Sequence, residues 1–157
     1  MLGHTEIVKT LLDRKAHVDV AGRDGWRPIH HASFGGSLDV AKYLVQSGTN
    51  LDIANNKGYT PLHYAAKEGH LDFAKYLVEN GANLNAVGGG DGRSPLHFVV
   101  CAGSLDLVEY LISKDADLGA TTRHGVTPLH MAAHFGHFEI VRSMVETGSN
   151  LEAVDLN

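Results

Sequence analysis

Four stretches of thirteen residues, repeated along the chain, restrict its possible folds more than any other feature of the sequence. They read GWRPIHHASFGGS from Gly25, GYTPLHYAAKEGH from Gly58, GRSPLHFVVCAGS from Gly92 and GVTPLHMAAHFGH from Gly125. The spacing between their first glycines is 33 or 34 residues, and all four prolines of the chain fall at the same place within them. A period of this length predicts a solenoid, in which each repeat packs only against its neighbours.

Each repeat predicts two helices. The proline favours the start of a short first helix, because the first turn of a helix does not need the missing N–H group. A second helix then follows, and in the most regular repeat it shows an apolar stripe of Leu71, Phe73, Ala74, Leu77 and Val78. Glycines such as Gly48 and Gly81 are typical residues for ending that helix.

The shared T-P-L-H-x-A-A core closely resembles the ankyrin repeat, and the resemblance covers essentially the whole chain. It implies an all-α solenoid of ankyrin repeats, each a β-hairpin finger plus two antiparallel helices. It also implies that the repeated histidines His30, His63, His97 and His130 make hydrogen bonds that fix the turn and bridge to the next repeat. Arg27 replaces the usual threonine beside His30, which leaves the bonds at His30 open.

The repeat pattern divides the chain into a half repeat and four full repeats within a single domain. We expect the half repeat at 1–19, full repeats at 20–53, 54–86, 87–120 and 121–153, and the start of a further repeat at 154–157. The fourth repeat departs from the pattern, with an extra glycine in 88–90, Val99-Val100 in place of Ala65-Ala66, and Asp115 in place of the helix-ending glycine. Because neither end shows a polar capping repeat, we expect a fragment of a longer array.

Composition limits the classes of partner. A formal charge of −5, with the basic residues scattered, argues against nucleic-acid binding. No apolar run reaches the length of a membrane span, and no secretory signal is evident. Cys101 is the only cysteine, so no disulfide within the chain is possible. These features predict a cytoplasmic, or at least intracellular, monomer, with the nucleus left open.

The sequence signals for a metal, phosphate-binding or catalytic site are all incomplete. His130 and His134 have a spacing that can chelate zinc, but no third or fourth ligand is identifiable. The glycine run 88–90 lacks the lysine that a phosphate-binding loop requires, and Cys101, placed on an exposed site of a first helix, has no identifiable base. We therefore expect no metal, no cofactor and no catalytic residue.

The residues that vary between repeats indicate the binding site. In the ankyrin family partners dock on the concave surface formed by finger tips and first helices, and Trp, Tyr and Arg are frequent hot spots. The residues expected on that surface are Arg23, Asp24, Trp26, Phe34, Asn56, Lys57, Tyr59, Lys67, Glu68, Asp91, Arg93, Arg123, His124, His134 and Phe135.

The predicted function is therefore non-catalytic recognition of a partner protein or peptide. The alternative is a targeting or regulatory segment of a larger enzyme or channel. Asn85 matches an asparagine that is hydroxylated in some family members, but a role in bonding the finger is the preferred interpretation.

Overall fold

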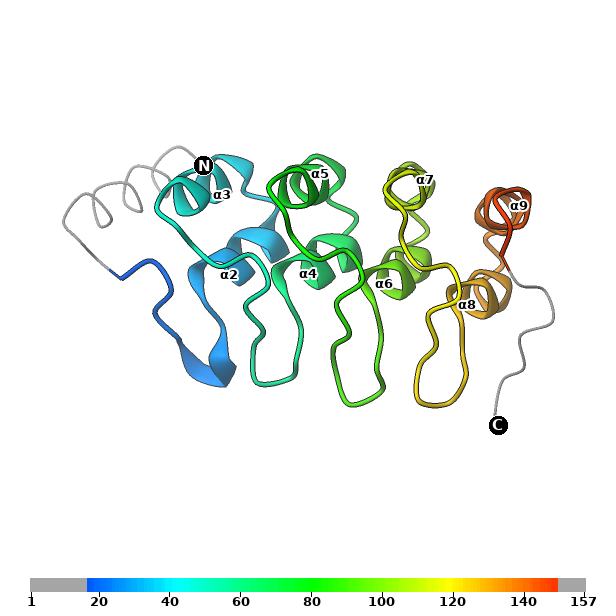
Figure 1. The fold of residues 1–157 in the computed structure, drawn as a ribbon, viewed down its shortest axis with the longest axis horizontal. Coiled ribbons are helices and arrows are strands. Elements are labelled where there is room, and N and C mark those ends of the chain that lie inside the picture. The colour runs from blue at the N-terminus through cyan, green and yellow to red at the C-terminus, as the bar shows by residue number, and fades with distance from the viewer. Residues whose placement is uncertain (1–16, 150–157) are drawn as a thin grey trace.

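The computed structural model describes residues 17–149. The expected half repeat lies almost entirely outside these residues, as does the start of a further repeat. Figure 1 shows two rows of helices along the molecule, with the loops that precede the first helices projecting to one side. The first helices of the repeats are α2 (Pro28–Gly35), α4 (Pro61–Lys67), α6 (Pro95–Ala102) and α8 (Pro128–His134). The second helices are α3 (Leu38–Gln46), α5 (Leu71–Glu79), α7 (Leu105–Ser113) and α9 (Phe138–Glu146).

The helices begin and end where the sequence predicts. Each first helix has its proline in the first turn. Gly48 and Gly81 follow second helices with φ values of 85° and 93°, and Asp115 takes the same left-handed conformation with a φ of 64°. Aspartate tolerates this region better than most residues, which is why α7 ends in register despite the missing glycine.

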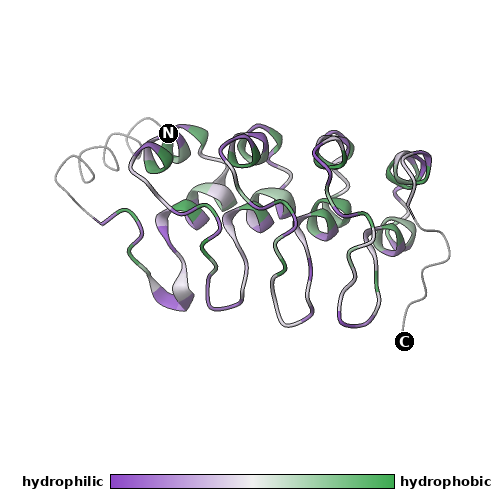
Figure 2. Ribbon diagram, viewed as in Figure 1, coloured by the Kyte–Doolittle hydropathy of each residue, from purple (hydrophilic) through white to green (hydrophobic). Residues whose placement is uncertain are grey.

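The core lies between the two rows of helices. Leu62 of α4 and Leu77 of α5 are fully buried, as are Leu96 of α6 and Leu111 of α7. Figure 2 shows apolar residues in both rows, whereas the tip formed by the short 3-10 helix η1 (Arg23–Gly25) is hydrophilic. The all-helical solenoid expected from the repeat is therefore confirmed.

The fingers are less regular than β-hairpins. Within residues 17–149 the only bridge is antiparallel and joins Gly88 to Arg93, with N–O distances of 2.9 and 3.0 Å. Neighbouring fingers also bond tip to tip, from Asn56 N to Asp24 O at 3.0 Å and from Arg123 N to Asp91 O at 2.9 Å. Backbone bonds between fingers thus add to those within each finger, such as Asn55 N to Tyr59 O at 3.0 Å.

Three of the repeated histidines, those of α2, α4 and α6, fix their helix to the next finger. Nδ1 of His63 accepts a hydrogen bond from the backbone N–H of Thr60 at 3.1 Å, so Nε2 carries the ring proton. Nε2 then donates to the carbonyl oxygen of Arg93 at 3.0 Å. His30 and His97 make the same bond to the carbonyl oxygens of Tyr59 and Val126, each at 3.1 Å.

Arg27 does not disturb this pattern. Its backbone N–H still donates to Nδ1 of His30 at 3.1 Å. Its guanidinium Nη1 donates to the carbonyl oxygens of Gly25 and Ala54 instead, at 3.0 and 3.3 Å. The bond that the sequence left open is therefore present, without the additional hydroxyl that Thr60 supplies to His63.

Candidate protein-binding groove

In two fingers an aromatic ring lies against the residue that directly follows the repeated histidine of the next first helix. The same finger position is occupied in turn by Trp26, Tyr59, Arg93 and Val126. The ring of Trp26 lies 4.4 Å from that of Tyr64 on α4, between centroids. Tyr59 repeats the contact with Phe98 on α6 at 5.3 Å, edge to face. These separations are those of favourable aromatic pairs, so the contacts link three successive repeats.

Together these rings form an aromatic groove of about 380 Å³. It is lined by Trp26, Phe34, Lys57, Tyr59, His63, Tyr64, Lys67 and Phe98. Phe34 lines the groove beside Trp26, with 6.1 Å between the ring centroids, and 47% of its surface is exposed. The groove is therefore open at Phe34, while Tyr64 is buried and Phe98 packs against the core.

A buried amide holds two of the tyrosines in place. Asn55 Nδ2 donates to the hydroxyl oxygen of Tyr64 at 2.7 Å, while its Oδ1 accepts from the backbone N–H of Tyr59 at 3.1 Å. Burial raises the pKa of both tyrosine hydroxyls, so both stay neutral at ordinary pH. The groove is thus ordered by the protein itself before any ligand binds.

The charged groups in the groove are basic. Lys67 Nζ lies 5.9 Å from the centroid of the Phe34 ring and 3.5 Å from Oε1 of Glu68. Lys57 lines the same groove from the finger, and no carboxylate is among the lining residues.

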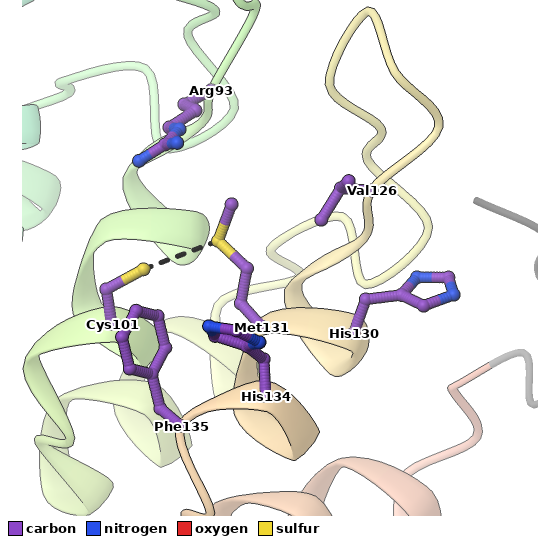
Figure 3. Close-up of a pocket in the computed structure, with 7 residues that line it drawn as sticks. All are labelled: Arg93, Cys101, Val126, His130, Met131, His134 and Phe135. Carbon is purple, nitrogen blue, oxygen red and sulfur yellow. Dashed lines mark hydrogen bonds between the residues drawn. The ribbon is translucent and has the colours of Figure 1, made fainter. Parts of the chain in front are cut away.

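A second depression of about 500 Å³, the C-terminal hollow, lies between α6 and α8. Figure 3 shows Cys101 and Met131 facing each other across it, with Sγ and Sδ 3.3 Å apart. The ring of His130 points away from these two sulfurs. The remaining lining residues are Arg93, Val126, His134 and Phe135.

A family model described as ankyrin repeats (3 copies) matches residues 1–88 and again residues 83–155. The chain belongs to the ankyrin-repeat family. Ankyrin repeats generally serve as protein–protein interaction modules and are typically non-catalytic. A comparison with curated proteins found no match.

The predicted site residues of this ankyrin-repeat chain fall into three groups. Trp26, Phe34, Lys57, Tyr59 and Lys67 line the aromatic groove, and Arg93, His134 and Phe135 line the C-terminal hollow. Glu68 and Asp91 lie beside them as the ion-pair partners of Lys67 and Arg93. The remaining five line neither depression and are exposed on the fingers: Arg23, Asp24, Asn56, Arg123 and His124.

The prediction also missed lining residues. Tyr64, Phe98 and Met131 directly follow the repeated histidines, and their variation against a constant neighbour is the signal that could have found them. Cys101 was expected at an exposed site, but it is half-buried beside Met131 and its pKa is raised by burial. A thiol held neutral in this way is a poor nucleophile.

Three further possibilities are a metal site, a membrane-spanning helix and a special role for Asn85. Between residues 17 and 149, no three His, Cys, Asp or Glu side chains gather in a way that could hold a metal ion. Across the same residues, none of the helices is long and apolar enough to cross a membrane. Asn85 Oδ1 accepts from the backbone N–H of Asp117 in the next repeat at 2.9 Å, as Asp52 does from Asn83 at 2.7 Å. Asn85 therefore bonds one repeat to the next.

Proposed function

We propose that this ankyrin-repeat chain binds a partner protein or peptide on its concave face, in the aromatic groove. The observation that carries the proposal is the run of aromatic contacts from Trp26 to Phe98, which crosses two repeat boundaries and lines an open depression. Side chains needed only for stacking would be covered, whereas Phe34 is 47% exposed. Apolar side chains that are at least partly exposed around one shared depression are typical of interaction sites.

The geometry favours binding because the groove is preformed. Asn55 and the repeated histidines hold the backbone of the fingers, so little conformational entropy is lost when a ligand orders the rings. Aromatic anchors in such a setting commonly carry most of the binding energy. Phe135, which is 52% exposed in the C-terminal hollow, extends the surface toward α8.

The role we propose is recognition without chemistry, by a single copy of the chain acting in the cytoplasm. The absence of chemistry is supported by two potentially reactive side chains whose contacts are structural. The imidazole of His63 is occupied by two backbone partners, and the thiol of Cys101 lies against a thioether.

Affinity capture with quantitative mass spectrometry tests the proposal. We expect the variant Trp26→Ala/Tyr59→Ala/Phe135→Ala to lose at least ten-fold of its retained partner relative to the unmodified chain. Phe138→Ala is the matched control, because Phe138 is a 69% exposed aromatic on α9 that lines neither depression. Circular dichroism of each variant establishes that the helices are kept. Undiminished capture by the triple variant would refute the proposal.

A further inference from the structure

We infer that the segment recognised on this face is acidic: an extended peptide whose large apolar side chains enter the aromatic groove next to aspartate or glutamate residues. This inference rests on the proposed function and adds the chemical class of the partner. It is carried by the charges of the side chains that line the two depressions.

Every fully charged side chain that lines either depression is a cation. Lys57 and Lys67 line the aromatic groove, and Arg93 lines the C-terminal hollow. Glu68 and Asp91, which line neither depression, pair with Lys67 and Arg93. The chain as a whole carries a net charge of −5, so the lining of the two depressions is more basic than the molecule as a whole.

Apart from Glu68 and Asp91, many acidic residues of the repeats lie on the second helices. One carboxylate recurs in the first turn of each second helix, on the other helical row, and all four are exposed: Asp39, Asp72, Asp106 and Glu139. The second helices thus carry carboxylates that the lining of the two depressions lacks, although Lys42 and Arg142 pair with Asp39 and Glu139 on the same helices. A partner with acidic residues is attracted to the lysines of the groove, which favours its approach from this side.

Arg93 provides a carboxylate site between the two depressions. Its guanidinium carbon lies 5.9 Å from the centroid of the Phe98 ring, at the edge of the aromatic groove, while the side chain also lines the C-terminal hollow. The ion pair with Asp91 uses Nε, and a guanidinium presents further N–H donors that suit a carboxylate. A carboxylate bound there has apolar depressions on both sides.

A cationic ligand suits the groove poorly, although aromatic rings attract cations in general. Lys67 already places its own ammonium group over the Phe34 ring. A ligand ammonium entering the groove would meet Lys57 and Lys67 without any lining carboxylate to offset the repulsion. The same two lysines favour a ligand carboxylate.

Selection from a random dodecapeptide display library on the full chain provides the first test. We expect the retained peptides to be enriched in Asp and Glu next to Phe, Tyr, Trp or Leu, and to be lost on Trp26→Ala/Tyr59→Ala. Retained peptides that are neutral or basic, yet still lost on that variant, would overturn the acidic class and leave the proposed function standing. Retention that does not depend on Trp26 and Tyr59, or no retention, would overturn both.

Fluorescence anisotropy with three synthetic versions of one selected peptide provides the second test. The versions carry Glu, Gln or Lys at the acidic positions, and we expect the Glu version to bind at least ten-fold more tightly than the Lys version. Lys57→Glu/Lys67→Glu should reverse this order, and added salt should weaken the Glu version most. Lys42→Glu/Lys114→Glu makes the same charge change at two exposed lysines outside both depressions and should preserve the order. Equal affinities of the three versions would contradict the inference.

Discussion

At the scale of single residues, the repeated histidines are the most informative groups. His63 is buried, accepts a backbone N–H at Nδ1 and donates to the next finger from Nε2. Burial lowers its pKa to about 4, and the pKa values of His30 and His97 are lowered for the same reason. A second ring proton would remove the acceptor at Nδ1, so the neutral ring is the form that the fold requires.

This predicts that acid weakens the stack. The unfolded chain binds a proton at His63 below about pH 6.5, whereas the folded chain does so only near pH 4, so the stability contribution is complete above pH 6.5 and is lost as pH falls. Between pH 7.5 and pH 5, His63 alone should lower the free energy of unfolding by about 2 kcal/mol. Urea denaturation at the two pH values measures this change.

The matched variants are His63→Gln and His124→Gln. His63→Gln cannot take up the proton and should show a smaller loss of stability between the two pH values. His124 is exposed on a finger, so His124→Gln should keep the full loss. An identical pH dependence in the unmodified chain and in His63→Gln would show that the histidine is not responsible.

At the scale of helices, Asp115 is the residue where the chain departs from its own pattern. It follows α7 with a φ of 64°, at the position that Gly81 occupies after α5. An L-residue is strained there, and a carboxylate at a helix C-terminus faces the negative end of the helix dipole. Asp115→Gly should therefore stabilise the protein by about 0.5–1 kcal/mol, as measured by urea denaturation.

Asp115→Asn separates the two causes, because it removes the charge and retains a side chain at positive φ. We expect it to recover only the part due to the helix dipole. A loss of stability in Asp115→Gly would mean that the greater freedom of glycine in the unfolded chain outweighs the strain.

Val99 in α6 is a second departure from the repeat pattern. Here, unlike at Asp115, restoring the residue of the neighbouring repeat should destabilise the protein. Its counterpart in α4 is Ala65, and both are fully buried. Because the surroundings of Val99 have packed around the larger side chain, Val99→Ala should cost about 2 kcal/mol in urea denaturation, even though alanine is the residue of the neighbouring repeat. Val87→Ala, at a 68% exposed finger position, should change stability by less than about 0.5 kcal/mol. An equal effect of the two changes would contradict the packing described for α6.

At the scale of the whole molecule, the repeat pattern predicted the positions of the helices better than the contacts between repeats. Proline and glycine positions predict the helix ends, because each acts locally on the backbone, and eight helices follow the pattern within residues 17–149. Contacts between repeats are not local. That Tyr64 and Phe98 contact Trp26 and Tyr59 depends on how one finger packs against the next helix, which no single repeat encodes.

The same limit applies to the predicted site residues that line neither depression. Asn56 and Arg123 vary between repeats, but their backbone groups bond to neighbouring finger tips while their side chains are exposed, outside both depressions. Variation alone marks solvent-exposed positions. The structure shows which of those variable positions line a shared depression and which do not.

The most direct measurement of the central claim uses Trp26, the only tryptophan in the chain and a lining residue of the aromatic groove. Titration of the full chain with the tightest-binding display peptide should shift or quench tryptophan emission. The change should saturate with the same dissociation constant that calorimetry gives for the chain and this peptide. Phe34→Ala should raise the dissociation constant by the same factor in the two measurements. Binding detected by calorimetry with unchanged Trp26 emission would contradict recognition in the groove.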